Sequence, residues 1–146
     1  MTLYTIGFTK KNAYRFFELI KRHNIEVLVD VRLNNKSQLA GFTKGEDLPY
    51  FLEEICKCKY YHNIDFAPTK EILDAYKKNK ITWGEYVEQY EPLIEKRKAV
   101  QLFLKLFSKY ENVCLLCSEP TPEQCHRRLF AEMVQKEESS IVIKHL

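Results

Sequence analysis

The segment from Val113 to Arg128 holds side chains that can act as nucleophiles, proton carriers and anion ligands. It begins with a short apolar run of β-prone residues, which is typical of a strand buried on both faces. The chemistry follows this strand, in Cys117, Glu119, Cys125, His126, Arg127 and Arg128. A strand that leads through a loop into a helix leaves unpaired backbone N–H groups and partial positive charge in that loop. Because arginines lie beside it, this corner is predicted to bind an anion.

The helix after this corner is predicted to run from Pro122 to about Lys136. Thr121 suits the N-cap, proline suits the first helical position, and Gln124 at the third position completes a capping box. The local sequence therefore favours a helix that starts directly after the loop.

Cys125 then falls in the first turns of the helix, where the dipole and nearby cations favour a thiolate. We hypothesise a nucleophilic or redox-sensitive Cys125 with His126 as proton carrier. The alternative is that Cys125 packs as a buried hydrophobe against Cys117. Successive helical positions are about 100° apart, so one of Arg127 and Arg128 is expected to be solvated or surface-paired.

A zinc site is the other chemistry that this segment suggests. Cys114, Cys117, Cys125 and His126 follow the pattern C-x2-C-x7-C-H, and thiolates and imidazoles are the ligands that zinc prefers. Residues three apart on a strand point to opposite faces, so Cys114 and Cys117 cannot both reach one metal. We therefore predict no four-ligand zinc site, and a metal-dependent enzyme is the weakest functional hypothesis.

Strand and helix patterns alternate along the whole chain. Apolar or β-prone runs predict strands over 2–6, 26–32, 58–61, 113–117 and 141–143. Apolar spacing and capping residues predict helices after the first strand, from about Asp47 with Ile55 on its apolar face, and after Thr69. A capping box over Thr82–Glu85 predicts a further helical stretch to Ser108, with a break or kink at Pro92. This alternation predicts a single-domain, three-layer α/β/α fold with a mostly parallel sheet, Rossmann-like or flavodoxin-like.

Ligands of such folds bind outside the carboxyl ends of the strands. This rule is expected to bring Gly7–Thr9 and Asp30–Arg32 to the same rim as the corner after Cys117. Arg32 either pairs with Asp30 or clamps a phosphate. Glu119 is a candidate general base or ribose-hydroxyl acceptor. Side chains from Tyr60, Tyr61 and His62 are further candidates for the pocket wall.

Composition and charge limit the functional classes to which the chain could belong. The 146 residues carry a net charge of +3, which is too mild to indicate nucleic-acid binding by itself. Five cysteines, an odd number, and the lack of a secretory signal pattern predict a cytoplasmic chain with reduced thiols. No apolar run approaches the roughly 18 residues needed to span a bilayer. The sequence contains none of five common motifs: the phosphate loop, the dinucleotide-binding fingerprint, the zinc-protease motif, the nucleophile elbow of hydrolases and the C-x5-R motif of phosphatases.

Five short motifs resemble those of the family known as domain of unknown function 488. They are Thr5-Ile6-Gly7, Asp30-Val31-Arg32, Leu115-Leu116-Cys117-Ser118-Glu119, Cys125-His126-Arg127 and His145-Leu146. The resemblance covers nearly the whole chain in order. It implies an α/β fold and a site at these motifs, but no reaction. Residues 34–42 depart from the proline-containing loop common in the family and look like a subgroup version with its own substrate-loop detail.

Our first hypothesis is an enzyme that acts on a phosphorylated small molecule, a nucleotide or a nucleic-acid end. Its expected catalytic residues are Cys125, His126, Glu119 and Asp30, and its expected ligand-binding residues are Arg32, Arg127, Gly7 and Thr9. The alternative is a non-catalytic nucleotide- or nucleic-acid-binding module in which the thiols and the imidazole serve packing. The sequence assigns no cofactor and no oligomeric state.

Overall fold

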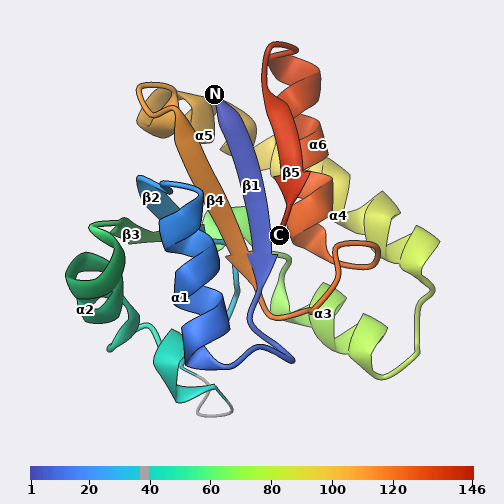
Figure 1. The fold of residues 1–146 in the computed structure, drawn as a ribbon. Coiled ribbons are helices and arrows are strands. Elements are labelled where there is room, and N and C mark those ends of the chain that lie inside the picture. Colours follow the sequence, from blue (N-terminus) through green and yellow to red (C-terminus); the bar gives the residue numbers. More distant parts are fainter. Residues whose placement is uncertain (37–39) are drawn as a thin grey trace.

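A computed structural model describes residues 1–36 and 40–146, in which five parallel strands form one sheet with helices on both faces (Figure 1). The strands lie in the order β3-β2-β4-β1-β5. Their bounds are β1 Thr2–Gly7, β2 Val27–Asp30, β3 Lys59–His62, β4 Asn112–Cys117 and β5 Val142–His145. The predicted α/β fold with a parallel sheet is thus confirmed.

The helices divide into two layers, one on each face of the sheet (Figure 1). On one face lie α1 Ala13–Arg22 and α2 Leu48–Phe51, the latter continued by a π-helical turn over Leu52–Cys56. On the other face lie α3 Lys70–Lys77, α4 Trp83–Arg97, α5 Ala99–Phe107 and α6 His126–Glu137. Within the described residues, no helix combines the length and apolar character that crossing a bilayer requires.

Strand β4 supplies side chains to both layers. Val113, Leu115 and Cys117 join the core under α4, α5 and α6, whereas Cys114 and Leu116 join the core under α1. Alternate residues of a strand point to opposite faces, so this division follows from the pleat. The predicted separation of Cys114 from Cys117 is confirmed.

The connections after β1 and β4 diverge. The two strands are neighbours, with Gly7 opposite Cys117, yet β1 leads into α1 on one face and β4 leads into α6 on the other. Such a divergence is the topological switch point at which α/β folds form ligand sites. In the Rossmann and flavodoxin arrangements β1 and β2 are neighbours, whereas here β4 is inserted between them.

Helix α6 starts at His126, four positions later than predicted, and its N-cap is Cys125 rather than Thr121. The predicted capping box does not form, because Gln124 accepts a hydrogen bond from the Tyr76 hydroxyl at 2.6 Å instead of turning back on its own helix. The contact to α3 keeps the start of this segment in a loop. Cys125 is therefore the residue before the helix, not a residue of its first turn.

Of the break or kink predicted at Pro92, the break does not occur there. Helix α4 passes through Pro92, and the chain breaks at Lys98, which has left-handed backbone angles. Pro92 and Glu88, whose carbonyl loses its helical partner, are both exposed, so water can satisfy that carbonyl.

Ile55, predicted on a buried face, is 44 % exposed because the π-helical turn changes the spacing of the face.

The connection between β2 and α2 contains a 3-10 turn at Gly41–Thr43. Residues 37–39, which fall in the stretch that departs from the family pattern, lie outside the described residues. The described part is anchored at its base, where the Gly45 N–H donates to the Asn35 carbonyl at 2.6 Å.

Gly7 is required by the close approach of the β4–α6 connection. A Cβ atom at Gly7 would lie 1.6 Å from the carbonyl oxygen of Glu119, whereas a Cβ at Gly41 would meet nothing within 4 Å. We expect Gly7→Ala to lower the free energy of unfolding by about 1–3 kcal/mol or more, as overpacking does. The matched Gly41→Ala should change it by less than about 0.5 kcal/mol. Urea denaturation checks both, and equal stabilities of the two variants would contradict the close approach.

Candidate functional site

A cavity of about 750 Å³ lies at the carboxyl ends of β1 and β4. Its wall carries four cationic side chains, those of Lys10, Lys11, Arg32 and Lys77. It also carries five aromatic rings, those of Phe8, Phe42, Tyr76, Trp83 and Tyr86. Two thiols and an imidazole, from Cys117, Cys125 and His126, complete the lining that matters for chemistry. The volume is in the usual range for small-molecule sites.

The cavity gathers most of the predicted site residues. Thr9, Arg32, Glu119, Cys125 and His126 line it. The other three predicted residues, Gly7, Asp30 and Arg127, are not among the lining residues, and both charged ones are fully buried. Their contacts are to the protein itself.

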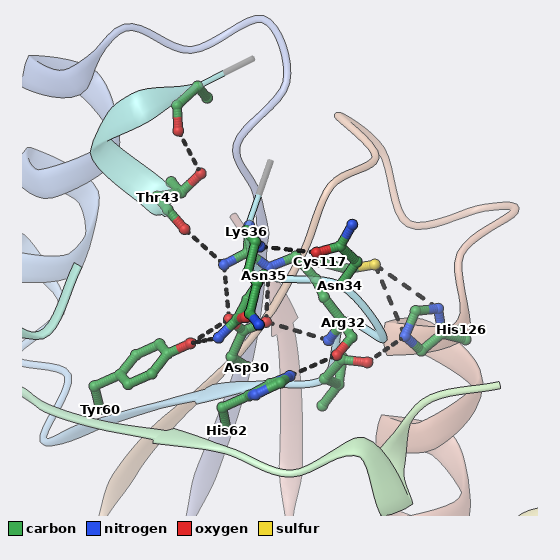
Figure 2. A network of polar contacts seen from close by, with 12 residues as sticks. Asp30, Arg32, Asn34, Asn35, Lys36, Thr43, Tyr60, His62, Cys117 and His126 are labelled. Carbon is green, nitrogen blue, oxygen red and sulfur yellow. Dashed lines mark hydrogen bonds and ion pairs between the residues drawn. The ribbon is translucent and has the colours of Figure 1, made fainter. Parts of the chain in front are cut away.

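The Cys117 sulfur and the His126 imidazole are in contact in the wall of the cavity (Figure 2). The Nε2 atom of His126 lies 2.7 Å from the Val31 carbonyl, which can only accept, so Nε2 carries the proton and donates it. The Nδ1 atom lies 3.7 Å from the Cys117 sulfur. The Nε2 atom lies 3.9 Å from the same sulfur, so the thiol is almost equally close to both ring nitrogens. The backbone carbonyl orients the ring and leaves Nδ1 as the nitrogen that can exchange a proton with the thiol.

The two thiols of the cavity differ in acidity. The pKa of Cys117 lies well below its usual range, because Cys125 and His126 hydrogen-bond to its thiolate and outweigh the effect of burial. The pKa of Cys125 lies well above its usual range, because its proton is held against Cys117 and the site is buried. Burial opposes the charged form of His126, but the Cys117 thiolate raises its pKa overall. The expectation that the surroundings favour a Cys125 thiolate is therefore reversed.

Arg127 is fully buried beneath the cavity and ties three elements together. Its Nη1 donates to the Glu119 carbonyl at 2.6 Å and to the Cys125 sulfur at 3.6 Å, and its Nε donates to the Thr5 hydroxyl at 3.2 Å. Among the described residues, no carboxylate pairs with it and its Nη2 has no hydrogen-bond partner. Arg127 is thus a buried cation without a counter-ion in the part of the chain described.

The positive charge of Arg127 contributes to the lowered pKa of two neighbouring bases. The pKa of Lys11 is lowered, first by partial burial and then by the Arg127 cation. The pKa of His145 is lowered by the same two causes in the same order. Both shifts indicate a positive potential around this end of the sheet.

Arg32 has the opposite arrangement, because its charge is neutralised (Figure 2). Its Nε and Nη2 donate to the two carboxylate oxygens of Asp30 at 2.8 and 2.7 Å, and Nη2 also donates to the Thr43 carbonyl at 2.7 Å. Of the two roles predicted for Arg32, pairing with Asp30 is observed. The guanidinium still borders the cavity, over the Phe8 ring at 5.3 Å.

The side chains of β3 support this ion pair and are not among those lining the cavity. The Tyr60 hydroxyl donates to Asp30 at 2.5 Å, and His62 Nε2 donates to the Arg32 carbonyl at 2.8 Å (Figure 2). Tyr61 packs against Phe107 at 5.2 Å between ring centroids.

Arg127 and Arg128 point in different directions, as expected for adjacent residues of a helix. Arg127 points inward, whereas the Arg128 side chain is 30 % exposed and lies 3.8 Å from Glu132. This pair is a surface contact along α6.

Sequence reasoning missed the lysines and the aromatic wall of the cavity. Lys10 and Lys11 lie three and four positions after the end of β1, so their place after a strand end was a usable signal. Lys77 and Trp83 come from α3 and α4. Their approach to the sheet depends on how helices distant in sequence pack, which no local pattern encodes.

A family model described as Domain of unknown function DUF488 matches residues 12–134, so the chain belongs to this family. No curated protein and no solved structure matches the chain.

Removing the counter-ion of Arg32 should destabilise the fold. Asp30→Asn leaves the guanidinium buried and unpaired, so we expect a loss of about 3–5 kcal/mol in the free energy of unfolding. The matched Asp74→Asn breaks the exposed pair with Lys70 and should cause no measurable change.

The double variant Asp30→Asn with Arg32→Met removes both charges and should recover part of the loss. Chemical denaturation measures all three proteins. A stability of Asp30→Asn equal to that of Asp74→Asn would show that the buried pair is not what anchors this end of β2.

Proposed function

We propose that this member of the DUF488 family is an enzyme that binds a phosphate-bearing small molecule, such as a nucleotide, in this cavity. The observation that carries the proposal is the meeting of cations, aromatic rings and a thiol–imidazole cluster in one cavity at the switch point of the sheet. Each group matches one part of such a ligand.

The cationic groups suit the phosphate. Lys10, Lys11 and Lys77 line the cavity against one acidic lining residue, Glu119. The buried Arg127 cation adds a positive potential from below. Charged groups arranged in this way attract anions from solution and hold them with charge-assisted hydrogen bonds.

The aromatic wall suits a nucleobase. Trp83 and Tyr86 are stacked, with ring centroids 4.9 Å apart and planes 16° from parallel, and Tyr76 lies 5.6 Å from Trp83. Aromatic rings at a binding site provide large, rigid, apolar surface on which bases stack. A nucleotide would therefore use both halves of the cavity.

The thiol–imidazole cluster supplies the reactive groups. Cys117 takes the place expected for Cys125, because its thiolate is the one that its neighbours stabilise. Val31, His126 and Cys117 form a chain of orienting carbonyl, imidazole and sulfur, which is the arrangement of an activated thiol.

A non-catalytic nucleotide-binding module is the second candidate. It is favoured by the engagement of Arg32 with Asp30, which leaves that arginine serving the structure. In this case a nucleotide would bind without turnover, and Cys117→Ser would leave the affinity unchanged.

The single tryptophan of the chain, Trp83, lines the cavity and reports binding there. We expect adenosine monophosphate to quench its fluorescence with saturation, and adenosine to bind more weakly because it lacks the phosphate. Lys11→Met should weaken binding of the monophosphate by roughly three- to tenfold, or up to about 1.4 kcal/mol. Raised salt should weaken it as well.

The matched control is Lys136→Met, which removes an exposed lysine of α6 that does not line the cavity and should leave the affinity unchanged. Titrations with ribose 5-phosphate and with a short single-stranded oligonucleotide separate the small-molecule ligand from a nucleic acid. Equal binding of adenosine and its monophosphate, or equal effects of the two lysine variants, would contradict the proposed anion site.

A further inference from the structure

We propose that Cys117, Cys125 and His126 form a binding site for a soft divalent cation of the zinc class, open to the cavity on one side. This inference goes beyond the proposed ligand site, because it changes what the thiol–imidazole cluster does. It also differs from the four-ligand zinc site that the spacing suggested, since Cys114 lies on the opposite face of β4.

The distances suit a tetrahedral centre. The two sulfurs and an imidazole nitrogen lie within 4.8 Å of one another, and the Cys117 sulfur is 3.7 Å from His126 Nδ1. With ordinary zinc bond lengths, a sulfur and a nitrogen on one ion lie about 3.6 Å apart and two sulfurs about 3.8 Å apart. Small side-chain movements are enough to place an ion among them.

The partners that orient metal ligands are already in place. A ligating histidine usually donates its second ring N–H to a carbonyl or carboxylate, which fixes the ring and frees the other nitrogen. His126 does so through Nε2 to the Val31 carbonyl at 2.7 Å, which leaves Nδ1, 3.7 Å from the Cys117 sulfur, as the nitrogen available to a metal. Arg127 donates to the Cys125 sulfur at 3.6 Å, a contact that stabilises a thiolate ligand.

The charges around the cluster are consistent with bound thiolates. Arg127 is a buried cation with no carboxylate partner among the described residues, so a negative sulfur beside it is favourable. Two thiolates balance the charge of one divalent ion. The cluster with its metal therefore adds no net charge to the interior, while Arg127 stays close to the sulfurs.

The fourth position of such a centre faces the cavity. Cys117, Cys125 and His126 all line it, so a water molecule or a bound ligand can complete the coordination. Three protein ligands with one open position are typical of catalytic zinc rather than structural zinc. Where the proposed phosphate-bearing ligand occupies the cavity, the ion would polarise it or activate water beside it.

Metal analysis of the purified full chain tests the site directly. We expect about one equivalent of zinc per chain, lost on treatment with a strong chelator and regained on adding Zn²⁺. Reconstitution with Co²⁺ should give thiolate-to-cobalt charge-transfer absorption. Cys117→Ser and His126→Ala should weaken Co²⁺ binding by more than about 100-fold, because even outer partners of metal ligands contribute about 10- to 100-fold.

Cys56→Ser is the matched thiol control, since Cys56 lies far along the chain, in the π-helical turn, and does not line the cavity. It should keep the cobalt absorption. A measurement on the unmodified chain does not depend on how well a variant folds. In this chain, bound Zn²⁺ should protect Cys117 and Cys125, but not Cys56, from alkylation.

The inference is overturned if the folded, unmodified chain binds neither Zn²⁺ nor Co²⁺, or if Cys117 is alkylated equally fast with and without metal. The cluster would then be a free thiol–imidazole pair. A nucleotide titration of the chelator-treated protein, followed by Trp83 fluorescence, distinguishes the two proposals. If the chain binds nucleotide but no metal, only the metal site is rejected. If it binds metal but no nucleotide, only the proposed ligand site is rejected.

Discussion

A guanidinium enclosed inside the protein is the constraint on which the site depends. Burying a charge costs several kcal/mol unless polar partners replace the lost water. Arg127 obtains such partners from the Thr5 hydroxyl, the Glu119 carbonyl and the Cys125 sulfur, and not from a carboxylate of the described residues. The β4–α6 connection must therefore stay close to β1, and only a glycine at position 7 leaves room for it.

The two inward-facing arginines of the site illustrate how one residue type serves opposite purposes. Arg32 meets both oxygens of Asp30 and fastens the connection after β2 through the Thr43 carbonyl, so its charge is largely cancelled. Arg127 keeps its charge and depresses the pKa of Lys11 and His145, after burial. The potential that favours an anion therefore comes from the arginine that does not line the cavity and from the three lysines that do.

Periodicity and capping residues were sufficient to predict most of the fold. A buried β4 shows as an uninterrupted apolar run, and the Thr82–Glu85 capping box forms as predicted. The errors arose where a tertiary contact competed with a local signal. The capping residues at Thr121 and Gln124 were overridden by the bond from Tyr76, and the exposed carbonyl before Pro92 made a helix break unnecessary.

Only the part of the site that lies at the carboxyl ends of the strands could be predicted from the sequence. The rule that ligands bind at the carboxyl ends of strands brought Thr9, Arg32, Glu119 and His126 to the cavity, since it depends on topology alone. The pairing of Arg32 with Asp30 was one of the two roles predicted for that arginine. The burial of Arg127 without a carboxylate partner among the described residues, and the approach of Lys77 from α3, depend on packing between distant segments. Those facts have no counterpart in the spacing of the sequence.

The exchange of roles between Cys117 and Cys125 follows from the same competition between local and tertiary effects. A helix N-terminus favours a thiolate, and this effect alone points to Cys125. Hydrogen bonds act at shorter range. Cys117, at the end of β4, accepts them from Cys125, from His126 and from the Ser118 N–H, so its sulfur is the one that carries the negative charge. A thiol that attacks a ligand and a thiol that holds a metal both need this deprotonated sulfur. The two chemistries differ in the second sulfur, because an attacking Cys117 is served by a protonated Cys125, whereas a metal centre requires Cys125 to lose its proton as well.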